Sequence, residues 1–343
     1  MKVLTSVDSE RLSELRASRT IGVLMGGPSE EREISLKSGS AVVTHLAEAG
    51  YRAEPCDFRT QDELRAQLLE KKIDFVFLAL HGRYGEDGTV QRFLESLNVS
   101  YTGSSAEASR VAFDKWATWQ ILRDKGLLTP RAIVVGAGEA IPAVPFDPST
   151  GSGSMVSVSR TIDFPIVVKP VCQGSSLGLS IVDTPETLPE AVQEAFQHDH
   201  RILIEEYIPG PELTVGILGD EALPIIQILP ANRCYDYDAK YFNAKTQYLV
   251  PAPVNAELGD RVQHVALKTH QALGCRDFSR VDILLKERTE PVILEINTIP
   301  GLTSRSLLPK ACGVAGISFL ELCERILLMA VMREQLAQES TSK

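Results

Sequence analysis

The sequence predicts an α/β protein that begins with a parallel sheet. A short apolar strand at residues 21–25 runs into the turn Gly26-Gly27-Pro28-Ser29, and a helical pattern follows from 31 to 49. A second buried strand spans 75–80 and ends at His81-Gly82. Alternation of strand, loop and helix is typical of a parallel sheet, whose active-site loops lie at the carboxyl ends of the strands.

Composition and length indicate a cytoplasmic globular protein. The 343 residues are 44% hydrophobic and 23% charged, which is ordinary for an enzyme of two or three domains. The net charge of −10 and the pI of about 5.2 argue against a nucleic-acid surface. The six cysteines lack CxxC spacing, which predicts reduced thiols rather than a disulfide framework or zinc site. We find neither a long apolar run nor, in residues 1–19, a signal-peptide core, so we expect no membrane association.

The central and carboxyl-terminal parts also mix strands with helices. Helices are predicted at 111–125, where Trp116 and Trp119 are assigned to the core, and at 318–335. Strands are predicted at 166–169 and 201–208, and the runs 213–218 and 223–229 indicate a hairpin. The Ser- and Gly-rich segment 145–160 is predicted to be a mobile loop within a domain.

A candidate metal site lies in the last quarter of the chain. Asp282 is on a predicted strand that begins at Phe278, and Glu295 and Asn297 lie two residues apart on the next strand. Alternate strand residues share a face, so Glu295 and Asn297 project together, and an antiparallel partner can bring Asp282 beside them. Oxygen donors without His or Cys suit Mg²⁺, which usually also holds substrate phosphates. A polar sheet edge is the alternative for a lone Glu-x-Asn, and the nearby Arg280 and Pro300-Gly301 favour a functional site.

Phosphate-binding residues are predicted in the loop 173–178, which reads Gln-Gly-Ser-Ser-Leu-Gly. Small residues let backbone N–H groups approach phosphate oxygens, although most such loops are only turns. Lys169, on the strand just before the loop, can neutralise phosphate charge and strengthens the case. Lys115 is a second candidate, with a solvated helix lysine as the alternative. The sequence contains no Walker A motif, which argues against a P-loop kinase fold.

Five motifs follow one another along the chain: GGPSEEREIS (26–35), LHGRYGEDGT (80–89), KPVCQGSSLG (169–178), YDYDAKY (235–241) and LEINTIPG (294–301). Together they resemble the D-alanine–D-alanine ligase family of the ATP-grasp superfamily, from about residue 21 to the final helix. The resemblance implies an amino-terminal α/β domain (20–105) followed by two ATP-grasp subdomains (106–207 and 208–343), with ATP between the last two. Residues 1–19 would be an amino-terminal extension.

The resemblance also implies which residues bind ATP and metal. Lys115 and Lys169 would bind the ATP phosphates. Glu205 would meet the adenine amino group, the backbone near Glu206 and Ile208 would flank the ring, and Glu212 would hold the ribose. The metal ligands would be Asp282, Glu295 and Asn297, which would hold two Mg²⁺ ions that Mn²⁺ can replace.

A further set of residues would handle the amino acids. Glu31 would bind the ammonium of the first D-alanine, with His81 near that substrate. Ser175 and Tyr241 would join Glu31 in a hydrogen-bonded set that closes a mobile loop, and Lys240 would lie near the transferred phosphate. Arg280 and the backbone N–H of Gly301 would stabilise the oxyanion. Ser306, with the backbone of Leu307, would receive the carboxylate of the second D-alanine.

The implied reaction joins two D-alanine molecules through an acyl phosphate, releases ADP and phosphate, and serves peptidoglycan precursor synthesis. The residue types suit this chemistry, because lysines and Mg²⁺ neutralise a transferred phosphoryl group. The acyl phosphate needs protection from water, and the aromatic and polar segment 234–248 is the predicted lid. The family resemblance also implies a homodimer.

Two alternative functions remain at this stage. One is a ligase that joins D-alanine to D-lactate or D-serine; Tyr241 favours the dipeptide-forming type, since this position differs in depsipeptide-forming ligases. The other is a catalytically silent nucleotide-binding regulator, against which the joint presence of Arg280 and the metal ligands argues. Gln173 stands where the family commonly has Glu, and the neighbouring Cys172 is unusual, so the local electrostatics of this loop depart from the family pattern.

Overall fold

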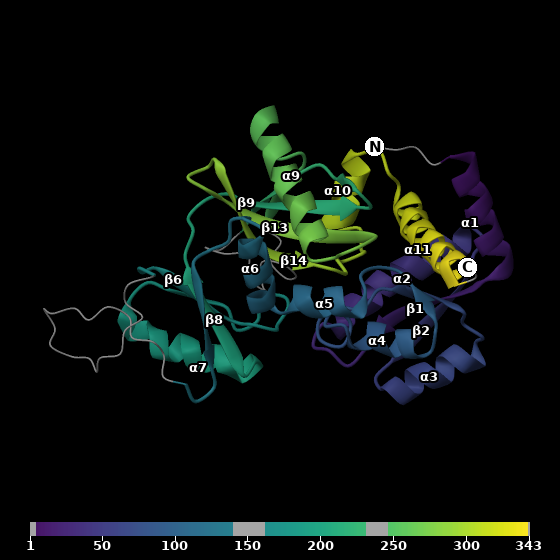
Figure 1. Ribbon diagram of the computed structural model, residues 1–343, viewed down its shortest axis with the longest axis horizontal. Helices are drawn as coiled ribbons and strands as arrows, with labels where there is room; N and C mark the ends of the chain where they lie inside the picture. The colour runs from purple at the N-terminus through teal and green to yellow at the C-terminus, as the bar shows by residue number, and fades with distance from the viewer. Residues whose placement is uncertain (1–4, 140–161, 231–245, 342–343) are drawn as a thin grey trace, which may run out of the picture.

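A computed structural model describes residues 5–139, 162–230 and 246–341. The described strands form three sheets, one parallel sheet followed by two antiparallel sheets (Figure 1). The predicted loop at 145–160 lies outside the described residues. Within the described ranges, no helix is long and apolar enough to cross a membrane.

The first sheet is parallel, as predicted, with the strand order β2-β1-β3-β4. Its strands are β1 (Thr20–Gly26), β2 (Arg52–Phe58), β3 (Phe75–Leu78) and β4 (Ser100–Tyr101). β1 and β3 are buried almost throughout, as expected for parallel strands covered on both faces. The loops that follow these two strands carry Glu31 and His81, so both residues lie at the carboxyl edge of the sheet.

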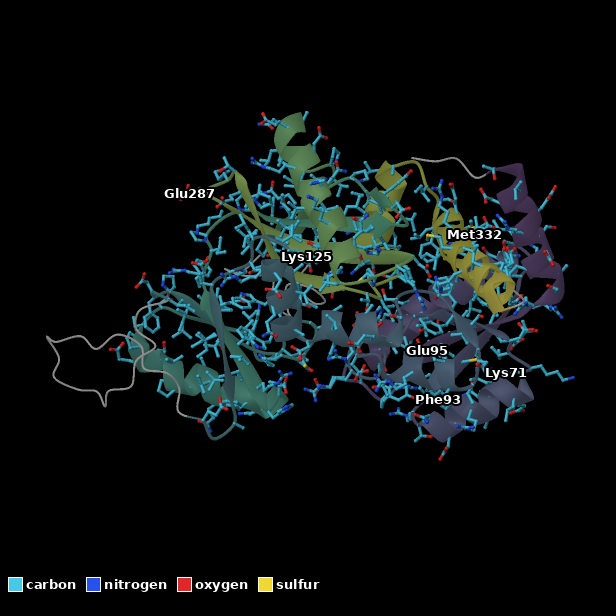
Figure 2. The ribbon with its side chains drawn as sticks, in the orientation of Figure 1. Lys71, Phe93, Glu95, Lys125, Glu287 and Met332 are labelled. Carbon is cyan, nitrogen blue, oxygen red and sulfur yellow. The ribbon has the colours of Figure 1, made fainter. Side chains whose placement is uncertain are left out.

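Helices from both ends of the chain cover this first sheet. The local helices are α2 (Arg32–Glu48), α3 (Gln61–Glu70) and α4 (Thr89–Ser96). The last helix, α11 (Phe319–Thr341), returns to pack against α2 and β4 (Figure 1). It holds α1 (Ser6–Ser18) through an Arg16–Glu324 ion pair of 3.3 Å and, just after α1, through an Arg19–Glu334 ion pair of 3.1 Å. Met332 lies on the surface of α11 near α1 (Figure 2). The predicted terminal helix therefore extends six residues beyond 335, from Gln335 to Thr341.

The single helix predicted at 111–125 is wrong, because the chain forms two helices there. α5 (Ala106–Phe113) ends at Asp114, and α6 (Lys115–Asp124) begins directly after it. The Asp114 side chain accepts from the N–H of Ala117 at 2.9 Å, while the N–H of Lys115 donates to the carbonyl of Val171. Because the Asp114 side chain caps α6, it favours a new helix over the continuation of α5. The break between the two helices places Lys115 at the start of α6.

The assignment of Trp116 and Trp119 to the core is also wrong, since both are only half-buried. Their rings stack on each other with centroids 4.6 Å apart. The indole N–H of Trp119 donates to the carbonyl of Pro130 at 2.7 Å. The two tryptophans thus form a surface stack that ties α6 to the following loop.

The second sheet has the order β5-β8-β6-β7 and is antiparallel. Its strands are β5 (Ala132–Gly136), β6 (Ile166–Pro170), β7 (Ser180–Val182) and β8 (Arg201–Glu206). A short 3₁₀ turn (Pro185–Thr187) leads into α7 (Leu188–His198). The buried side chains of α7 form one core with those of β6 and β8, so α7 covers one face of this sheet. The loop between β6 and β7 contains the predicted phosphate-binding residues.

The third sheet has the order β12-β11-β9-β13-β14, with β10 paired to β9. Its strands are β9 (Glu212–Leu218), β10 (Glu221–Ala222), β11 (Ile226–Leu229), β12 (Gln247–Leu249), β13 (Phe278–Lys286) and β14 (Glu290–Asn297). β9 pairs antiparallel with β11, which confirms the predicted hairpin. Its helices are α9 (Ala256–Ala272) and α10 (Leu307–Val314). Glu287 lies at the outer tip of the β13–β14 hairpin (Figure 2), and the opposite end of this hairpin carries the candidate metal ligands.

Candidate functional site

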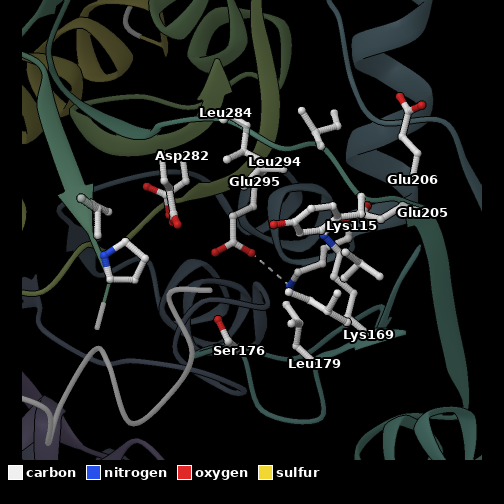
Figure 3. Close-up of a pocket in the computed structure, with 18 of the residues that line it drawn as sticks. Lys115, Lys169, Ser176, Leu179, Glu205, Glu206, Asp282, Leu284, Leu294 and Glu295 are labelled. Carbon is white, nitrogen blue, oxygen red and sulfur yellow. Dashed lines mark hydrogen bonds and ion pairs between the residues drawn. The ribbon is translucent and has the colours of Figure 1, made fainter. Parts of the chain in front are cut away.

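A cleft of about 270 Å³ lies between the second and third sheets (Figure 3). Strands β6 and β8 supply one wall, and strands β9, β11, β13 and β14 supply the other. The predicted site residues that line it are Lys115, Lys169, Glu205, Glu206, Ile208, Glu212, Asp282 and Glu295. The fold therefore brings together residues that lie up to 180 positions apart in the sequence, from Lys115 to Glu295.

Two lysines of the cleft are held by carboxylates. The ammonium of Lys169 donates to Glu205 Oε1 at 2.6 Å, and both side chains are buried. The ammonium of Lys115 lies 3.4 Å from Glu295 Oε2, an ion pair that spans the cleft (Figure 3), and donates to the carbonyl of Gln173 at 2.7 Å. A buried charge is tolerated only with such partners, so the cleft keeps two cations ready for an anionic ligand.

The rest of the cleft is mostly apolar. Its aliphatic side chains belong to Val167, Leu177, Leu179, Ile181, Ile208, Ile228, Leu229, Leu284 and Leu294. Flat rings bind between such walls, and a few polar groups at the rim fix their orientation. Glu206 adds little negative charge to the cleft, because its carboxylate forms a 2.7 Å ion pair with the exposed Arg131.

The candidate metal ligands face each other across β13 and β14. Asp282 stands opposite Glu295 in the register, and Arg280 stands opposite Asn297. The amide of Asn297 donates to Asp282 Oδ2 at 3.2 Å, and the hydroxyl of Thr214 on β9 donates to Asp282 Oδ1 at 2.5 Å. The sequence prediction that an antiparallel partner brings Asp282 beside Glu295 and Asn297 is confirmed.

Arg280 makes a two-point contact with Asp282. Its Nε lies 2.9 Å from Oδ1 and its Nη2 lies 2.8 Å from Oδ2. A guanidinium matches a carboxylate in this planar geometry, which fixes both side chains on the same face of the sheet. Two of the five N–H donors of Arg280 are used in this contact.

The donor set fits a hard cation such as magnesium better than zinc or copper. It consists of two carboxylates and one amide on adjacent strands, all with oxygen atoms. Among the residues that the structure describes, no cluster of three or more His, Cys, Asp or Glu side chains could enclose an ion. Mg²⁺ keeps several waters and is usually held by one or two carboxylates together with substrate phosphates, so it does not need a closed protein cage.

The loop between β6 and β7 approaches the first sheet. Ser175 and Ser176 have φ angles of 53° and 58°, a left-handed conformation that turns the loop sharply. The hydroxyl of Ser175 donates to Glu31 Oε1. A Cβ on Gly174 would lie 2.7 Å from Glu31 Oε2, so the lack of a side chain here lets the loop come close to the carboxylate.

Glu31 and the neighbouring Glu86 form a buried acidic corner. Glu31 is only 7% exposed and precedes α2, while Glu86 follows β3 and accepts from the N–H of Gly82 at 2.7 Å. Burial and the nearby Glu31 carboxylate raise the pKa of Glu86 to about 8. Sequence analysis missed Glu86, although it belongs to the quoted motif at 80–89, because nothing in the residue pattern signals that this acid is buried.

His81 links the first sheet to the loop after β14. Its Nδ1 lies 3.1 Å from the carbonyl of Ile299 and its Nε2 lies 2.9 Å from the hydroxyl of Ser38. The Ile299 carbonyl can only accept, so Nδ1 carries the imidazole proton and Nε2 is the acceptor. The Ser38 hydroxyl therefore donates to Nε2 while its oxygen accepts from the N–H of Leu302. Burial lowers the pKa of His81 to about 4, which keeps the ring neutral.

The loop after β14 carries the last two predicted residues. The Ser306 hydroxyl accepts from the N–H of Thr303 at 3.1 Å and precedes α10. A Cβ on Gly301 would lie 2.7 Å from Ser306 Oγ, so the loop folds tightly around this hydroxyl. Gly301 and Ser306 thus lie together, and the His81–Ile299 bond fixes this loop to the acidic corner.

Lys240 and Tyr241 lie outside the described residues, as does most of the predicted lid at 234–248. The end of that segment is not irregular, because Gln247 and Tyr248 belong to β12 and pair with β11.

The five described cysteines are free, as predicted. Burial raises the pKa of Cys172 to about 11, so this residue beside the loop is a thiol at neutral pH.

Comparisons with known proteins agree along the chain. Residues 54–104 match the family model described as D-ala D-ala ligase N-terminus, and residues 145–328 match D-ala D-ala ligase C-terminus. The D-alanine–D-alanine ligase of Geobacter sulfurreducens is 44% identical over 93% of this chain and 96% of its own length. That of Syntrophotalea carbinolica is 43% identical over 92% and 97%.

Solved structures give the same result. The D-alanine–D-alanine ligase from Bacillus anthracis superimposes with a TM-score of 0.77 at 36% identity, covering 93% of this chain and all of that chain. A structure of the Bacillus anthracis enzyme complexed with ATP gives a TM-score of 0.76 at 34% identity with the same coverage. Both similarities extend over all three sheets.

Proposed function

The chain belongs to the D-alanine–D-alanine ligase family, and from this premise we propose how its residues use ATP to join two D-alanine molecules. The observation that carries the proposal is the Asp282–Glu295 pair on β13 and β14, which faces Lys115 across a cleft with apolar walls. Acidic metal ligands opposite cations are what a nucleotide triphosphate requires. The parallel sheet and the two antiparallel sheets form the ATP-grasp fold of the ligase structures.

We propose that ATP occupies the cleft between the second and third sheets. The aliphatic walls that include Ile208 would enclose the adenine, with Glu205 at its amino group and the backbone near Glu206 at the ring edge. Glu212, at the start of β9, would hold the ribose. Lys115 and Lys169 would turn from their present carboxylate partners toward the phosphates, which exchanges one anionic partner for another.

We propose that Asp282, Glu295 and Asn297 hold two Mg²⁺ ions, for which Mn²⁺ can substitute. A bound metal would neutralise negative charge on the transferred phosphoryl group. Asp282 stays oriented by Thr214 and Arg280, so the carboxylate is preorganised for a ligand. Glu295 would exchange its ion pair with Lys115 for the metal.

The corner around Glu31 would bind the first D-alanine. A buried carboxylate is a natural partner for the substrate ammonium, and the Ser175 hydroxyl orients it. The neutral His81 would border this substrate without adding a competing positive charge. The carboxylate of the first D-alanine would then point toward the phosphates, where its oxygen attacks the γ-phosphorus and ADP leaves.

The second D-alanine would be received by Ser306 and the backbone of Leu307 at the start of α10. Its free amine attacks the carbonyl carbon of the acyl phosphate, and the carbonyl oxygen becomes an oxyanion. When this intermediate collapses, the bond from carbon to the phosphate oxygen breaks, phosphate leaves and the nitrogen loses a proton. Arg280 and the backbone N–H of Gly301 would stabilise that charge; removal of one such donor typically costs about 10²–10³ in rate. Lys240 and Tyr241 would complete the set from the segment outside the described residues.

Product analysis tests the function. The protein is incubated with ATP, Mg²⁺ and a panel of D-alanine, D-serine and D-lactate, and nucleotide, phosphate and ligated products are identified. We expect ADP, phosphate and D-alanyl-D-alanine from D-alanine alone. Preferred formation of the D-alanyl-D-lactate ester or of D-alanyl-D-serine would contradict the dipeptide-forming reaction, and ATP binding without any product would indicate the silent regulator.

We further propose a cytoplasmic location and a homodimeric assembly. The support for the location is the substrate, because ATP is a cytoplasmic metabolite. The support for the dimer is the family resemblance alone. Sedimentation equilibrium of the purified protein tests the dimer, which requires a mass of twice 37.5 kDa.

A further inference from the structure

Arg83 forms a bridge between the first and second sheets that the proposed reaction does not use. It lies in the loop after β3, two residues beyond His81, and its side chain is half-exposed. Its Nε donates to the carbonyl of Cys172 at 3.1 Å, and its Nη2 donates to the carbonyl of His198 at 2.8 Å. One guanidinium therefore donates hydrogen bonds to two separate backbone segments of the central part of the chain.

Asp199 holds the Cys172 backbone beside the end of α7, because it directly follows His198 and bonds to the Cys172 N–H. The Asp199 side chain is 1% exposed, and its Oδ2 accepts from the N–H of Cys172 at 2.6 Å. His198 is the last residue of α7, where helix carbonyls lack intrahelical donors and the helix dipole is negative. Arg83 also lies 4.0 Å from Asp199 Oδ1, so an electronegative, rigid acceptor set meets a cation from another part of the fold.

Cys172 directly precedes the loop that borders both substrates. The next residue, Gln173, accepts from Lys115 through its carbonyl and donates from its side chain to Glu30 at 3.0 Å. Two residues further, Ser175 contacts Glu31. The segment 172–175 thus meets the amino-terminal part of the chain at three points, and the Arg83 contact is the one at the base of the loop.

We propose that Arg83 is a positioning residue that fixes the loop at 173–178 against the binding corner of the first D-alanine. This inference rests on the proposed function, because it assigns Arg83 to the same site. Arg83 touches neither reacting atoms nor the metal ligands. By holding the Cys172 carbonyl, it keeps Gly174 and Ser175 close to Glu31, which orients the carboxylate and closes the route by which water would reach the acyl phosphate.

The effect on the two substrates distinguishes positioning from a structural role. Loss of Arg83 opens the Glu31 side of the loop, so the KM for D-alanine should rise about tenfold, the scale of a charge-assisted hydrogen bond. Lys169 and β8 do not contact Arg83, but Lys115 is bonded to Gln173 next to Cys172. The KM for ATP should therefore rise as well, by about threefold, which is less than the rise in the KM for D-alanine. Phosphate release should exceed dipeptide formation, because water reaches the acyl phosphate.

The experiment compares Arg83→Ala and Arg83→Lys with the control Arg92→Ala. Arg92 is an exposed arginine on α4, a helix that covers the first sheet. Kinetic constants for both substrates, the ratio of phosphate to dipeptide and the melting temperature are measured. Arg83→Lys should be intermediate, since an ammonium keeps the charge but does not span both carbonyls. The proposal would be overturned if Arg83→Ala kept the wild-type kinetic constants and released one phosphate per dipeptide formed. An equal rise of both KM values with a lowered melting temperature would also overturn it.

An activity-independent measurement separates this inference from the proposed function. Hydrogen exchange of the amides at 172–178 is compared between the wild type and the three variants without substrates. Faster exchange in Arg83→Ala, partial recovery in Arg83→Lys and no change in Arg92→Ala are expected. Unchanged exchange would overturn the inference even if the wild type makes dipeptide, whereas faster exchange in a protein that makes none would refute only the function.

Discussion

The face of β13 and β14 and the corner around Glu31 hold their polar groups in different ways. On the strand face, Asp282, Glu295 and Asn297 meet through the register of one hairpin. In the corner, the Ser175–Glu31 and His81–Ile299 contacts join residues 144 and 218 positions apart. The strand face is therefore built as soon as one hairpin forms, whereas the corner exists only when distant parts of the chain dock.

This difference teaches where each region is vulnerable. A change on the strand face should remove chemistry and spare the fold, because neighbouring ladder bonds keep the strands in place. A change in the corner should alter stability or substrate binding, because its contacts also hold the sheets together. Four substitutions test this comparison, and they are ordered from the largest expected effect to the smallest.

Glu295→Ala should lower turnover by at least about 100-fold while the melting temperature stays close to that of the wild type. The substitution removes one of two carboxylates, and metal stabilisation of phosphoryl transfer is worth several kcal/mol. Dipeptide formation at limiting Mg²⁺ is measured with Glu290→Ala as control, since Glu290 is exposed at the far end of the same strand. Near wild-type turnover in Glu295→Ala would refute the metal-site proposal.

Glu86→Gln should flatten the dependence of stability on pH. Burial and Glu31 raise the folded-state pKa of Glu86 to about 8, against 4.5 as its ordinary value. Between these values the folded state keeps a proton that the unfolded state has lost, so the wild type loses stability as pH rises from about 5 through 8. Each pH unit in this window contributes up to about 1.4 kcal/mol. Urea unfolding at several pH values is compared with Glu54→Gln, an exposed control on β2; a slope in Glu86→Gln equal to the wild-type slope would contradict this.

Ser38→Ala should lower the free energy of unfolding by about 1–3 kcal/mol. Ser38 is fully buried and serves as acceptor for the N–H of Leu302 and as donor to His81, so its removal leaves buried groups without these bonds. The urea midpoint is measured against Ser40→Ala, which changes an exposed serine on the same helix. Equal midpoints for the two variants would show that the corner does not depend on this link.

Gln173→Glu should raise the KM for D-alanine by less than about fivefold. A carboxylate would replace the amide that donates to Glu30, and two like charges at the surface repel by no more than about 1 kcal/mol. The second change Glu30→Gln should restore the wild-type KM, and 0.5 M salt should shrink the difference by screening. If the double variant were worse than Gln173→Glu alone, the contact would not couple the loop to the first sheet.

The sequence by itself was sufficient for the local part of this protein. The strand–loop–helix alternation predicted the parallel sheet, because apolar runs and helical periodicity are local properties. The i, i+2 spacing of Glu295 and Asn297 predicted a shared face, because side chains alternate along every strand. The motifs carried the resemblance to the ligase family, which the relatives and solved structures support over more than nine-tenths of the chain.

Only the tertiary structure decided what burial and docking do to individual groups. The helix predicted through Asp114 breaks there because Val171 takes the N–H of Lys115, and Trp116 and Trp119 stack at the surface. Glu86 becomes a buried acid, and Arg83 becomes a bridge, through neighbours far away in the sequence. The physical reason is that desolvation and hydrogen-bond partners depend on which surfaces meet, and no residue pattern within one segment records that meeting.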